Sequence, residues 1–291
     1  VCRCAQNRGL RVTGTEIVGL IPKRTLIDAG KYFLEKQHRS TGIPESDIID
    51  IAIRSMGLSD LKPFKPEEKV IEYMLEADSN AKQLVDLTVK GFAEETSRES
   101  PAPGGGTIAA YMGALGAALG TMVANLSSHK AGWDDRWEEF SRYADQGQAL
   151  KDKLLHLVDE DTQAFNRIMA AFGMPKGSEE EKAARSAAIQ EGLKGCTRTP
   201  LEMMELCDET ITLAASLIGR FNDTSASDLG VSFLSLEAGI QGAWLNVLIN
   251  IGSIKDEAFA GEARARGEAL LKHALPLAAE CYDTLLKQIG G

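Results

Sequence analysis

The chain has 291 residues, of which 44% are hydrophobic and 25% charged, as in a globular protein that buries a core without disulfides or metals. Its formal net charge of −10, with no run of Lys and Arg, excludes nucleic acid as the expected partner because phosphates would be repelled. The length predicts one large domain or two modest ones.

The cysteines indicate a reducing compartment. Their scattered spacing completes no zinc-binding set, and the chain starts without a charged-then-apolar leader. We therefore expect free thiols, no metal and a cytoplasmic protein. The cysteines are Cys2, Cys4, Cys196, Cys207 and Cys281.

The first 64 residues predict a short α/β fragment. Strands are expected at residues 10–13 and 17–21, Pro22 then begins a helix, and a second helix is expected at residues 44–56. Two short strands do not make a stable sheet alone. The fragment therefore reads as the end of a domain whose beginning is missing.

Pro63 and Pro66 mark the best boundary, because two prolines so close together prevent regular structure across them. Residues 65–291 show no convincing strand and predict an all-α bundle. Helices are expected at 67–76, 80–95, 105–128, 134–172, 178–195, 200–219, 228–251 and 256–288. Expected breaks are Pro175, Gly177, Pro200 and the polar cluster at 222–227.

Residues 101–128 contain no charged side chain, which raises the possibility of a membrane span. Their composition is Gly, Ala, Thr and Ser rather than Leu, Ile and Phe, whereas a span needs about 20 strongly apolar residues. We predict instead a helix buried on all sides in a bundle, and no membrane partner.

Asp161 falls in the middle of an apolar stripe when residues 150–172 are placed on a helical wheel, whereas Asp152 and Asp159 point away. Burial raises the pKa of a carboxyl that has no compensating partner, and such a group can transfer protons near neutral pH. A structural Asp bonded to a helix end or an Arg fits equally well. The stripe consists of Leu150, Leu154, Leu157, Val158, Phe165, Ile168 and Phe172.

A stripe of small and polar residues follows one face of the otherwise apolar helix at 228–251. We favour a ligand site on this face, because two Asn and one Asp exceed what packing needs. Close packing of small residues between helices is the alternative. The stripe consists of Asp228, Ser232, Ser235, Gly239, Gly242, Ala243, Asn246 and Asn250.

The glycines at 104–106 precede the neutral helix. Glycines before a helix let a ligand approach its exposed N–H groups, although a flexible hinge explains them as well. Gly113, Gly116 and Gly120 line one side of the helix, which indicates tight contact with a neighbouring helix.

Several segments together carry a resemblance to a known family. They read Ser-Pro-Ala-Pro-Gly-Gly-Gly at 100–106, Asp-Glu-Asp-Thr-Gln-Ala-Phe at 159–165 with Met-Pro-Lys at 174–176, Ser-Asp-Leu-Gly at 227–230, and Ala-Trp-Leu-Asn-Val-Leu-Ile-Asn at 243–250. In this order they resemble the formiminotransferase-cyclodeaminases. Residues 15–22 resemble the end of that family's transferase domain, and residues 61–73 resemble the joint between the two enzymes.

The resemblance implies a cyclodeaminase-like helical domain over residues 65–291 and a transferase remnant over residues 1–64. The expected activity is that of an ammonia-lyase: 5-formiminotetrahydrofolate is converted to 5,10-methenyltetrahydrofolate and ammonia, in histidine degradation and one-carbon metabolism. The implied substrate is a tetrahydrofolate derivative, polyglutamylated as in the family, with no metal. The transferase's catalytic His belongs to an N-terminal half that is absent here, so we expect no transferase activity and a possible missing partner half.

The family's pattern places the catalytic Asp on Asp161, where one carboxyl would take a proton from the attacking folate nitrogen and give one to the departing amine. Lys130, Arg136, Lys176 and Arg220 are candidates for the charge that meets the glutamate tail. The expected substrate-binding residues are Pro103, Gly104, Gly105, Gly106, Asp228, Asn246, Asn250 and Lys176.

Two alternatives remain at this stage. The first is a methenyltetrahydrofolate cyclohydrolase on the same scaffold, in whose reaction water would take the place of ammonia. The second is a non-catalytic helical oligomerisation module, which would hold Asp161 in a salt bridge. Either way we expect a homo-oligomer, at least a dimer, because the helices at 105–128 and 229–251 are too neutral to face water all round.

Overall fold

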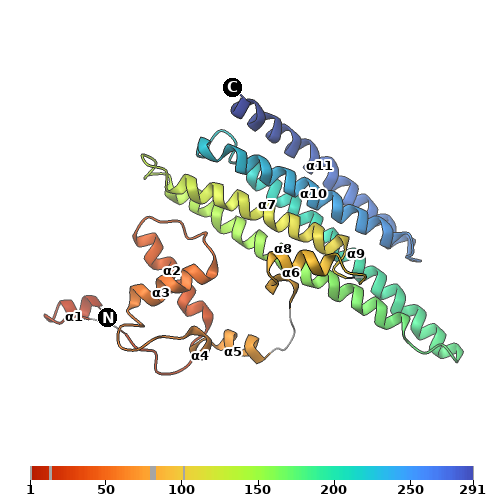
Figure 1. The fold of residues 1–291 in the computed structure, drawn as a ribbon, viewed down its shortest axis with the longest axis horizontal. Helices are drawn as coiled ribbons and strands as arrows, with labels where there is room; N and C mark the ends of the chain where they lie inside the picture. The colour runs from red at the N-terminus through yellow and green to blue at the C-terminus, as the bar shows by residue number, and fades with distance from the viewer. Residues whose placement is uncertain (1, 13–14, 79–82, 101, 291) are drawn as a thin grey trace. The chain divides into compact units, whose positions relative to one another are not determined.

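The computed structural model describes residues 2–12, 15–78, 83–100 and 102–290, and helices dominate its regular structure (Figure 1). The α-helices are α1 (Cys2–Gln6), α2 (Lys23–Lys36), α3 (Glu45–Met56), α4 (Pro66–Lys69), α5 (Ile71–Asp78), α6 (Val89–Thr96), α7 (Gly105–Ser128), α8 (Trp137–Phe172), α9 (Glu179–Ala215), α10 (Ala226–Ile251) and α11 (Glu257–Gly290). Short 3-10 helices lie at Leu84–Asp86 and Asp223–Ser225.

The expected N-terminal α/β fragment is wrong, because no strand occurs in the described residues. Ile21 and Val70 form only an isolated parallel bridge, in which Ile21 N donates to Lys69 O and Ile71 N to Ile21 O, each at 3.0 Å. A strand needs a neighbouring strand along its length, and residues 10–12 and 17–20 have none. Residues 13–14, part of the expected strands and their turn, lie outside the described residues.

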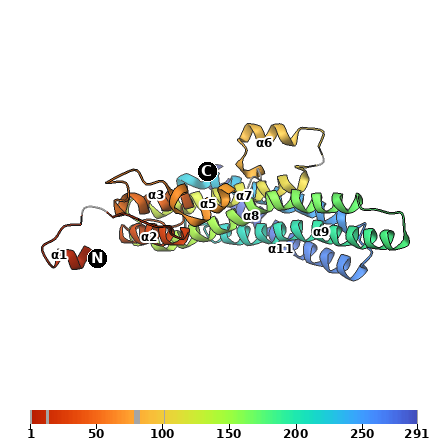
Figure 2. The same ribbon diagram turned by 90° about the horizontal axis from the view of Figure 1, so that it is seen from below.

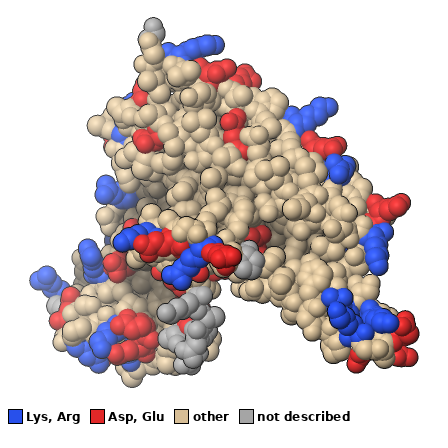
Figure 3. Space-filling view, turned by 45° about the vertical axis from the view of Figure 1, so that its right-hand side comes forward, with Lys and Arg blue, Asp and Glu red and all other residues tan. Residues whose placement is uncertain are grey.

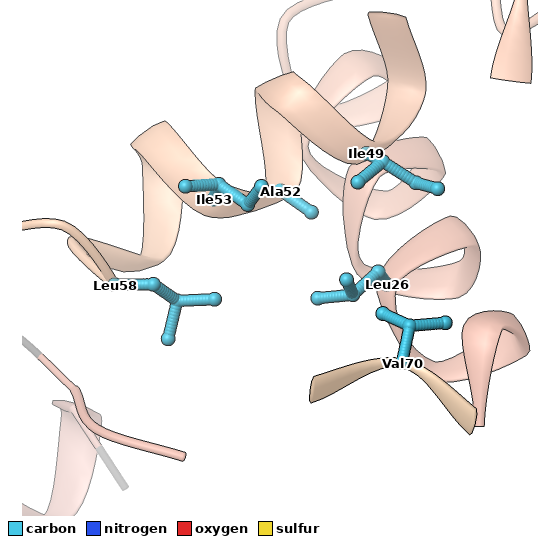
Figure 4. Close-up of a cluster of buried hydrophobic side chains, with 6 residues drawn as sticks. All are labelled: Leu26, Ile49, Ala52, Ile53, Leu58 and Val70. Carbon is cyan, nitrogen blue, oxygen red and sulfur yellow. The ribbon is translucent and has the colours of Figure 1, made fainter. Parts of the chain in front are cut away.

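Contacts between Cα atoms divide the chain into two compact units, Val1–Lys82 with Ser128–Asp145, and Gln83–Ser127 with Gln146–Gly291. The boundary expected between residues 64 and 65 lies inside the first unit. The core of that unit is an apolar cluster of α2, α3 and the segments after them, drawn in Figure 4. Its buried members are Leu26, Ile49, Ala52, Ile53, Leu58 and Val70.

The second unit is a bundle of long helices that lie side by side (Figures 1 and 2). A Cβ added to Gly116 would lie 2.6 Å from Leu236 Cγ, and one added to Gly239 would lie 3.0 Å from Ala109 O. The expectation that α7 glycines serve close helix contact is therefore confirmed. Since Ala109 meets Gly239 while Gly116 meets Leu236, α7 and α10 run antiparallel.

The short helix α6 stands to one side of the bundle (Figure 2). Leu84 N donates to Asp159 Oδ1 at 2.6 Å, and the rings of Phe92 and Tyr111 lie 5.2 Å apart. These contacts fix the segment before the glycine loop on α7 and α8. The helix expected at 80–95 is thus reduced to a 3-10 turn and α6, while residues 79–82 lie outside the described residues.

Pro200 does not separate two helices as expected, because α9 continues through it for 37 residues in all. The carbonyl that a proline leaves without a helical donor, that of Cys196, accepts a hydrogen bond from Asn250 Nδ2 at 2.7 Å. A contact between helices therefore supplies the hydrogen bond that the local sequence removes. Pro175 and Gly177 do lie in a break, between α8 and α9.

Helix α7 is long and apolar enough to cross a membrane by length and composition, with a mean hydropathy of 1.5 over its best window. That window is 56% buried, and the core helix of a soluble protein passes the same test. The prediction that α7 is buried on all sides needs correction, however. Its exposed apolar residues include Met112, Leu115, Met122 and Leu126.

Candidate functional site

The glycine loop leads directly into the N-terminus of α7. Pro103 is buried after a cis peptide bond, and Gly104 N donates to Thr107 Oγ1 at 3.3 Å. Gly104 O in turn accepts from Ile108 N at 3.1 Å, so the loop is bonded into the first helical turn. The loop is thus an ordered part of the site.

Asp161 extends from the middle of α8 toward this helix start. Its Oδ2 accepts a hydrogen bond from Thr107 Oγ1 at 2.9 Å, and Thr107 itself is fully buried. A Cβ on Gly106 would lie only 2.3 Å from Asp161 Oδ1, so any larger residue at 106 would displace the carboxyl group. The absence of a side chain at residue 106 therefore leaves the space that the Asp161 carboxyl occupies.

Burial raises the pKa of the Asp161 carboxyl, while hydrogen bonds from the side chain and backbone of Thr107 oppose that rise. The predicted place on the apolar stripe is consistent with this environment, since Leu150, Leu154 and Ile168 are buried. Phe172, at the end of the stripe, is exposed instead. A carboxyl with a raised pKa is suited to hold and transfer a proton.

Asn246 of α10 lies on the other side of the glycine loop. A Cβ on Gly105 would lie 3.4 Å from Asn246 Nδ2, which donates to Gly242 O at 2.9 Å. Asn246 therefore lies next to the glycine loop, as we predicted. Asn250, one turn further on, directs its amide to the backbone oxygens of Cys196 and Asn246. Its contacts are structural.

Cys196 of α9 also belongs to this site. Burial raises the pKa of the Cys196 thiol, and the charge of Asp161 raises it further. The wheel analysis did not identify Cys196 or Thr107 as site residues. For Thr107 a signal was available, because a Thr in the first turn after a glycine loop lies where a carboxylate from another helix can meet it. Nothing in the local sequence marks Cys196.

The structure does not bring Asp228 to Asp161 within one chain. Asp228 is eighteen residues before Asn246 on α10, or about 27 Å along the helix. Between them the small-residue stripe packs against α7: Ser232 Oγ donates to Gly116 O at 2.7 Å, and Gly242 faces Ala109. The middle of the stripe, at Ser232, Gly239 and Gly242, therefore serves helix packing, which was the alternative to the ligand site that we favoured.

Lys176 is exposed in the loop between α8 and α9. It lines a pocket of about 420 Å³, together with Lys182, Arg185, Ser186, Ile189, Gln190 and Lys255. The pocket is displaced along α9 from the Asp161 site. Ile189, which lines it, precedes Cys196 by seven residues, or about 10 Å along the helix. Lys130 and Arg136, which were also candidates for meeting the glutamate tail, do not line this pocket. Both lie over the ring of Trp133.

A second hollow, of about 880 Å³, lies between α8 and α9 and includes Glu160, Arg167 and Gly195 in its lining. Asp161 is not among its lining residues, although Glu160 and Gly195 are the chain neighbours of Asp161 and Cys196. Because the groove carries both signs of charge and lacks the glycine loop, we assign the site to the Asp161 contacts. Among the described residues, no group of three His, Cys, Asp or Glu side chains is placed to hold a metal ion.

Charged side chains are sparse over a broad upper area of the face shown in Figure 3. The neutral helices α7 and α10 carry exposed apolar residues despite their contact with each other. On α10 these include Val231, Leu234, Leu245 and Ile249.

These features define a class of protein: an all-helical domain with a largely buried carboxyl, whose pKa is raised, at the start of a glycine-initiated helix. A family model described as Formiminotransferase-cyclodeaminase matches residues 88–269, and one described as Formiminotransferase domain matches residues 1–76. The chain belongs to the formiminotransferase-cyclodeaminase family, as the sequence motifs predicted.

Individual relatives support this family assignment. The chain is 34% identical over 283 residues to the formimidoyltransferase-cyclodeaminase of Rattus norvegicus, which covers 97% of this chain and 52% of that protein. It is 38% identical over 203 residues to the methenyltetrahydrofolate cyclohydrolase of Methylorubrum extorquens, covering 70% of this chain and 98% of that protein. This chain thus spans about half the length of the rat relative.

A solved structure is similar as well. The formiminotetrahydrofolate cyclodeaminase of Thermotoga maritima superposes with a TM-score of 0.61 at 28% identity, covering 72% of this chain and 98% of that one. The helical architecture is therefore shared with an enzyme of this family.

Proposed function

We propose that this chain is a formimidoyltetrahydrofolate cyclodeaminase, an ammonia-lyase that converts 5-formiminotetrahydrofolate to 5,10-methenyltetrahydrofolate and ammonia. The observation that carries the proposal is the Asp161 carboxyl, whose pKa is raised by burial, held by Thr107 beside the glycine loop. The names of the relatives supply the substrate class.

The chemistry needs one group that both accepts and donates a proton. Starting from the protonated formimino group, the attacking folate nitrogen forms a bond to the formimino carbon and loses its proton to Asp161. Asp161 then gives a proton to the formimino nitrogen, the carbon–nitrogen bond breaks, and ammonia leaves. A carboxyl with a raised pKa suits both transfers.

Asp161→Asn tests the proposal, because it keeps the size of the side chain and removes the titratable proton. Ammonia release should fall about 100- to 10,000-fold while the protein remains folded. Asp152→Asn is the matched control, since Asp152 lies exposed on the same helix, and it should retain activity. Near-normal turnover of Asp161→Asn, measured with the melting temperature on the same sample, would remove Asp161 from the mechanism.

A methenyltetrahydrofolate cyclohydrolase is the second candidate, favoured by the match to nearly the whole length of the Methylorubrum enzyme. The transferase-domain match over residues 1–76 favours the cyclodeaminase, because that fusion pairs with deamination. Incubation with each substrate distinguishes them: the cyclodeaminase releases ammonia from the formimino compound, whereas a cyclohydrolase only hydrates the methenyl compound.

We further propose that the substrate is polyglutamylated and that its carboxylates bind the basic pocket around Lys176. Four cations line this pocket, and the nearby Glu179 pairs with only one of them, Lys182. A cationic pocket is notable on a chain with a net charge of −10. Its place beyond the end of the Asp161 site suits an extended ligand with an anionic end.

Replacing both Lys176 and Lys255 with Gln should raise KM for a polyglutamylated substrate more than KM for the monoglutamate, with little change in kcat. Lys153→Gln, on an exposed part of α8, is the control. Equal KM changes for the two substrates would contradict a tail site here.

For the whole protein we propose a cytoplasmic homo-oligomer in which a second copy covers the exposed apolar residues of α7 and α10. A separate or attached transferase half would supply the formimino substrate. These proposals rest on the neutral helices and on the match to a transferase domain.

A further inference from the structure

The structure assigns to Pro200 and Asn250 the role of a positioning pair, which holds the Cys196 wall and the Asn246 wall of the Asp161 site in register. Neither residue needs to touch the substrate for this role. The inference rests on the proposed function, and it concerns how the site is assembled rather than which group transfers the proton.

Pro200 removes one hydrogen bond from the interior of α9. Proline has no backbone N–H, so the carbonyl four residues earlier, that of Cys196, loses its donor within the helix. Pro200 is buried, as are Thr197 and Thr199 around it. Cys196 itself is half-buried, and a carbonyl shielded from water without a donor is costly, so a donor from another element stabilises it.

Asn250 supplies that donor from α10. Its Nδ2 lies 2.7 Å from Cys196 O and 2.8 Å from Asn246 O. The amide nitrogen has two hydrogens, and these two acceptors account for both. One side chain therefore links the opened carbonyl of α9 to the backbone of α10 at the residue that faces the glycine loop.

Both linked positions lie at the site formed by Asp161 and the glycine loop. The thiol of Cys196 lies within electrostatic reach of the Asp161 carboxyl, and the amide of Asn246 lies beside Gly105, the first residue of α7. A change in the separation or rotation of α9 and α10 here would alter two walls of the site at once. Displacement of a reacting group by about 1 Å is enough to lower a rate by about 100-fold.

Pro276 provides a matched control, because it is a second proline inside a long helix. It lies nine residues beyond Gly267, which packs against Trp244 on α10, and so about 13 Å further from the site along α11. Pro276→Ala tests the general effect of restoring a helical N–H. It should change stability alone.

The experiment is a double-mutant cycle of Pro200→Ala and Asn250→Ala, read out by kcat and KM for ammonia release and by the free energy of unfolding. Asn250→Ala alone should lower kcat about tenfold or more, with a smaller change in KM. In the Pro200→Ala background, where residue 200 again donates to Cys196 O, the further loss from Asn250→Ala should shrink to about threefold or less.

Additive effects of the two substitutions on unfolding would overturn the link between Pro200 and Asn250. Coupled unfolding with an unchanged kcat in all variants would leave a structural link and overturn the positioning role, as would equal losses for Pro276→Ala. Failure of the proposed function gives a different result: no ammonia release by the wild-type protein, with the coupling in unfolding still measurable.

Discussion

At the scale of single residues, Asp161 is subject to opposing effects on its pKa. Burial raises the pKa, and the hydroxyl and N–H of Thr107 lower it. Thr107 lies in the first turn of α7, so its hydrogen bond to Asp161 is also the helix-end contact that a structural Asp would make. The salt bridge expected of an oligomerisation module is not found for Asp161 among the described residues. A neutral donor stabilises the carboxylate less than a cation would, so the bonds from Thr107 offset only part of the effect of burial on the pKa.

The raised pKa makes a prediction for stability. Above its ordinary value of 3.8 the carboxyl ionises in the unfolded chain before it ionises in the folded one, so its contribution to stability falls as pH rises through the folded pKa. Asp161→Asn should therefore gain stability relative to wild type as the pH rises above 3.8, until the carboxyl has ionised in the folded chain as well. Denaturant unfolding at several pH values measures this; a constant difference across the range would mean that the pKa is not raised.

Gly106 makes a second prediction, because a Cβ there would lie 2.3 Å from Asp161 Oδ1 whereas one on Gly105 meets only Asn246 at 3.4 Å or more. Gly106→Ala should displace the carboxyl and lower kcat about 100-fold or more. Gly105→Ala should have a much smaller effect. Equal activities of the two variants would show that the carboxyl does not depend on this contact.

At the scale of elements, the pairing of α7 with α10 determines where the site forms. Glycines bring the two backbones close together, and the antiparallel register places the start of α7 beside Asn246 near the end of α10. Asp228, at the other end of α10, is kept away from Asp161 by the same register. The position of each polar residue along its helix therefore decides whether it belongs to the site.

Gly116→Ala tests this contact. Its Cβ would lie 2.6 Å from Leu236 Cγ and 3.0 Å from Ser232 O, so the helices must move apart, at a cost of about 1–3 kcal/mol in the free energy of unfolding. Gly261→Ala in α11 is the control, since no atom lies within 4 Å of the added carbon. It should stabilise by up to about 1 kcal/mol through helix propensity. Chemical denaturation measures both.

At the scale of the whole molecule, the exposed apolar residues of α7 and α10 predict self-association. Leu245 is 67% exposed, so Leu245→Lys should leave the fold of one chain intact and weaken an interface between copies. Val89→Lys, at an 81% exposed position on α6, is the control and should not change the assembly. Light scattering at micromolar concentration should give at least a dimer for wild type; a monomer would contradict this proposal.

The helical periodicity of the sequence determined most elements of the second unit and placed Asp161 on an apolar face, because both depend on residues a few positions apart. The glycines of α7 predicted a close helix contact for the same reason. The motifs at residues 100–106 and 159–165 also identified the family correctly. All of these signals are local in the chain.

Tertiary structure alone decided the rest. Pro200 was expected to end a helix, but Asn250, distant in sequence, supplies the missing donor and the helix continues. Asp228 and Asn246 share a helical face, yet only Asn246 lies by the glycine loop. Periodicity defines the face on which a residue lies, whereas the pairing and register of helices define what that face meets, and those depend on contacts between residues far apart in the chain.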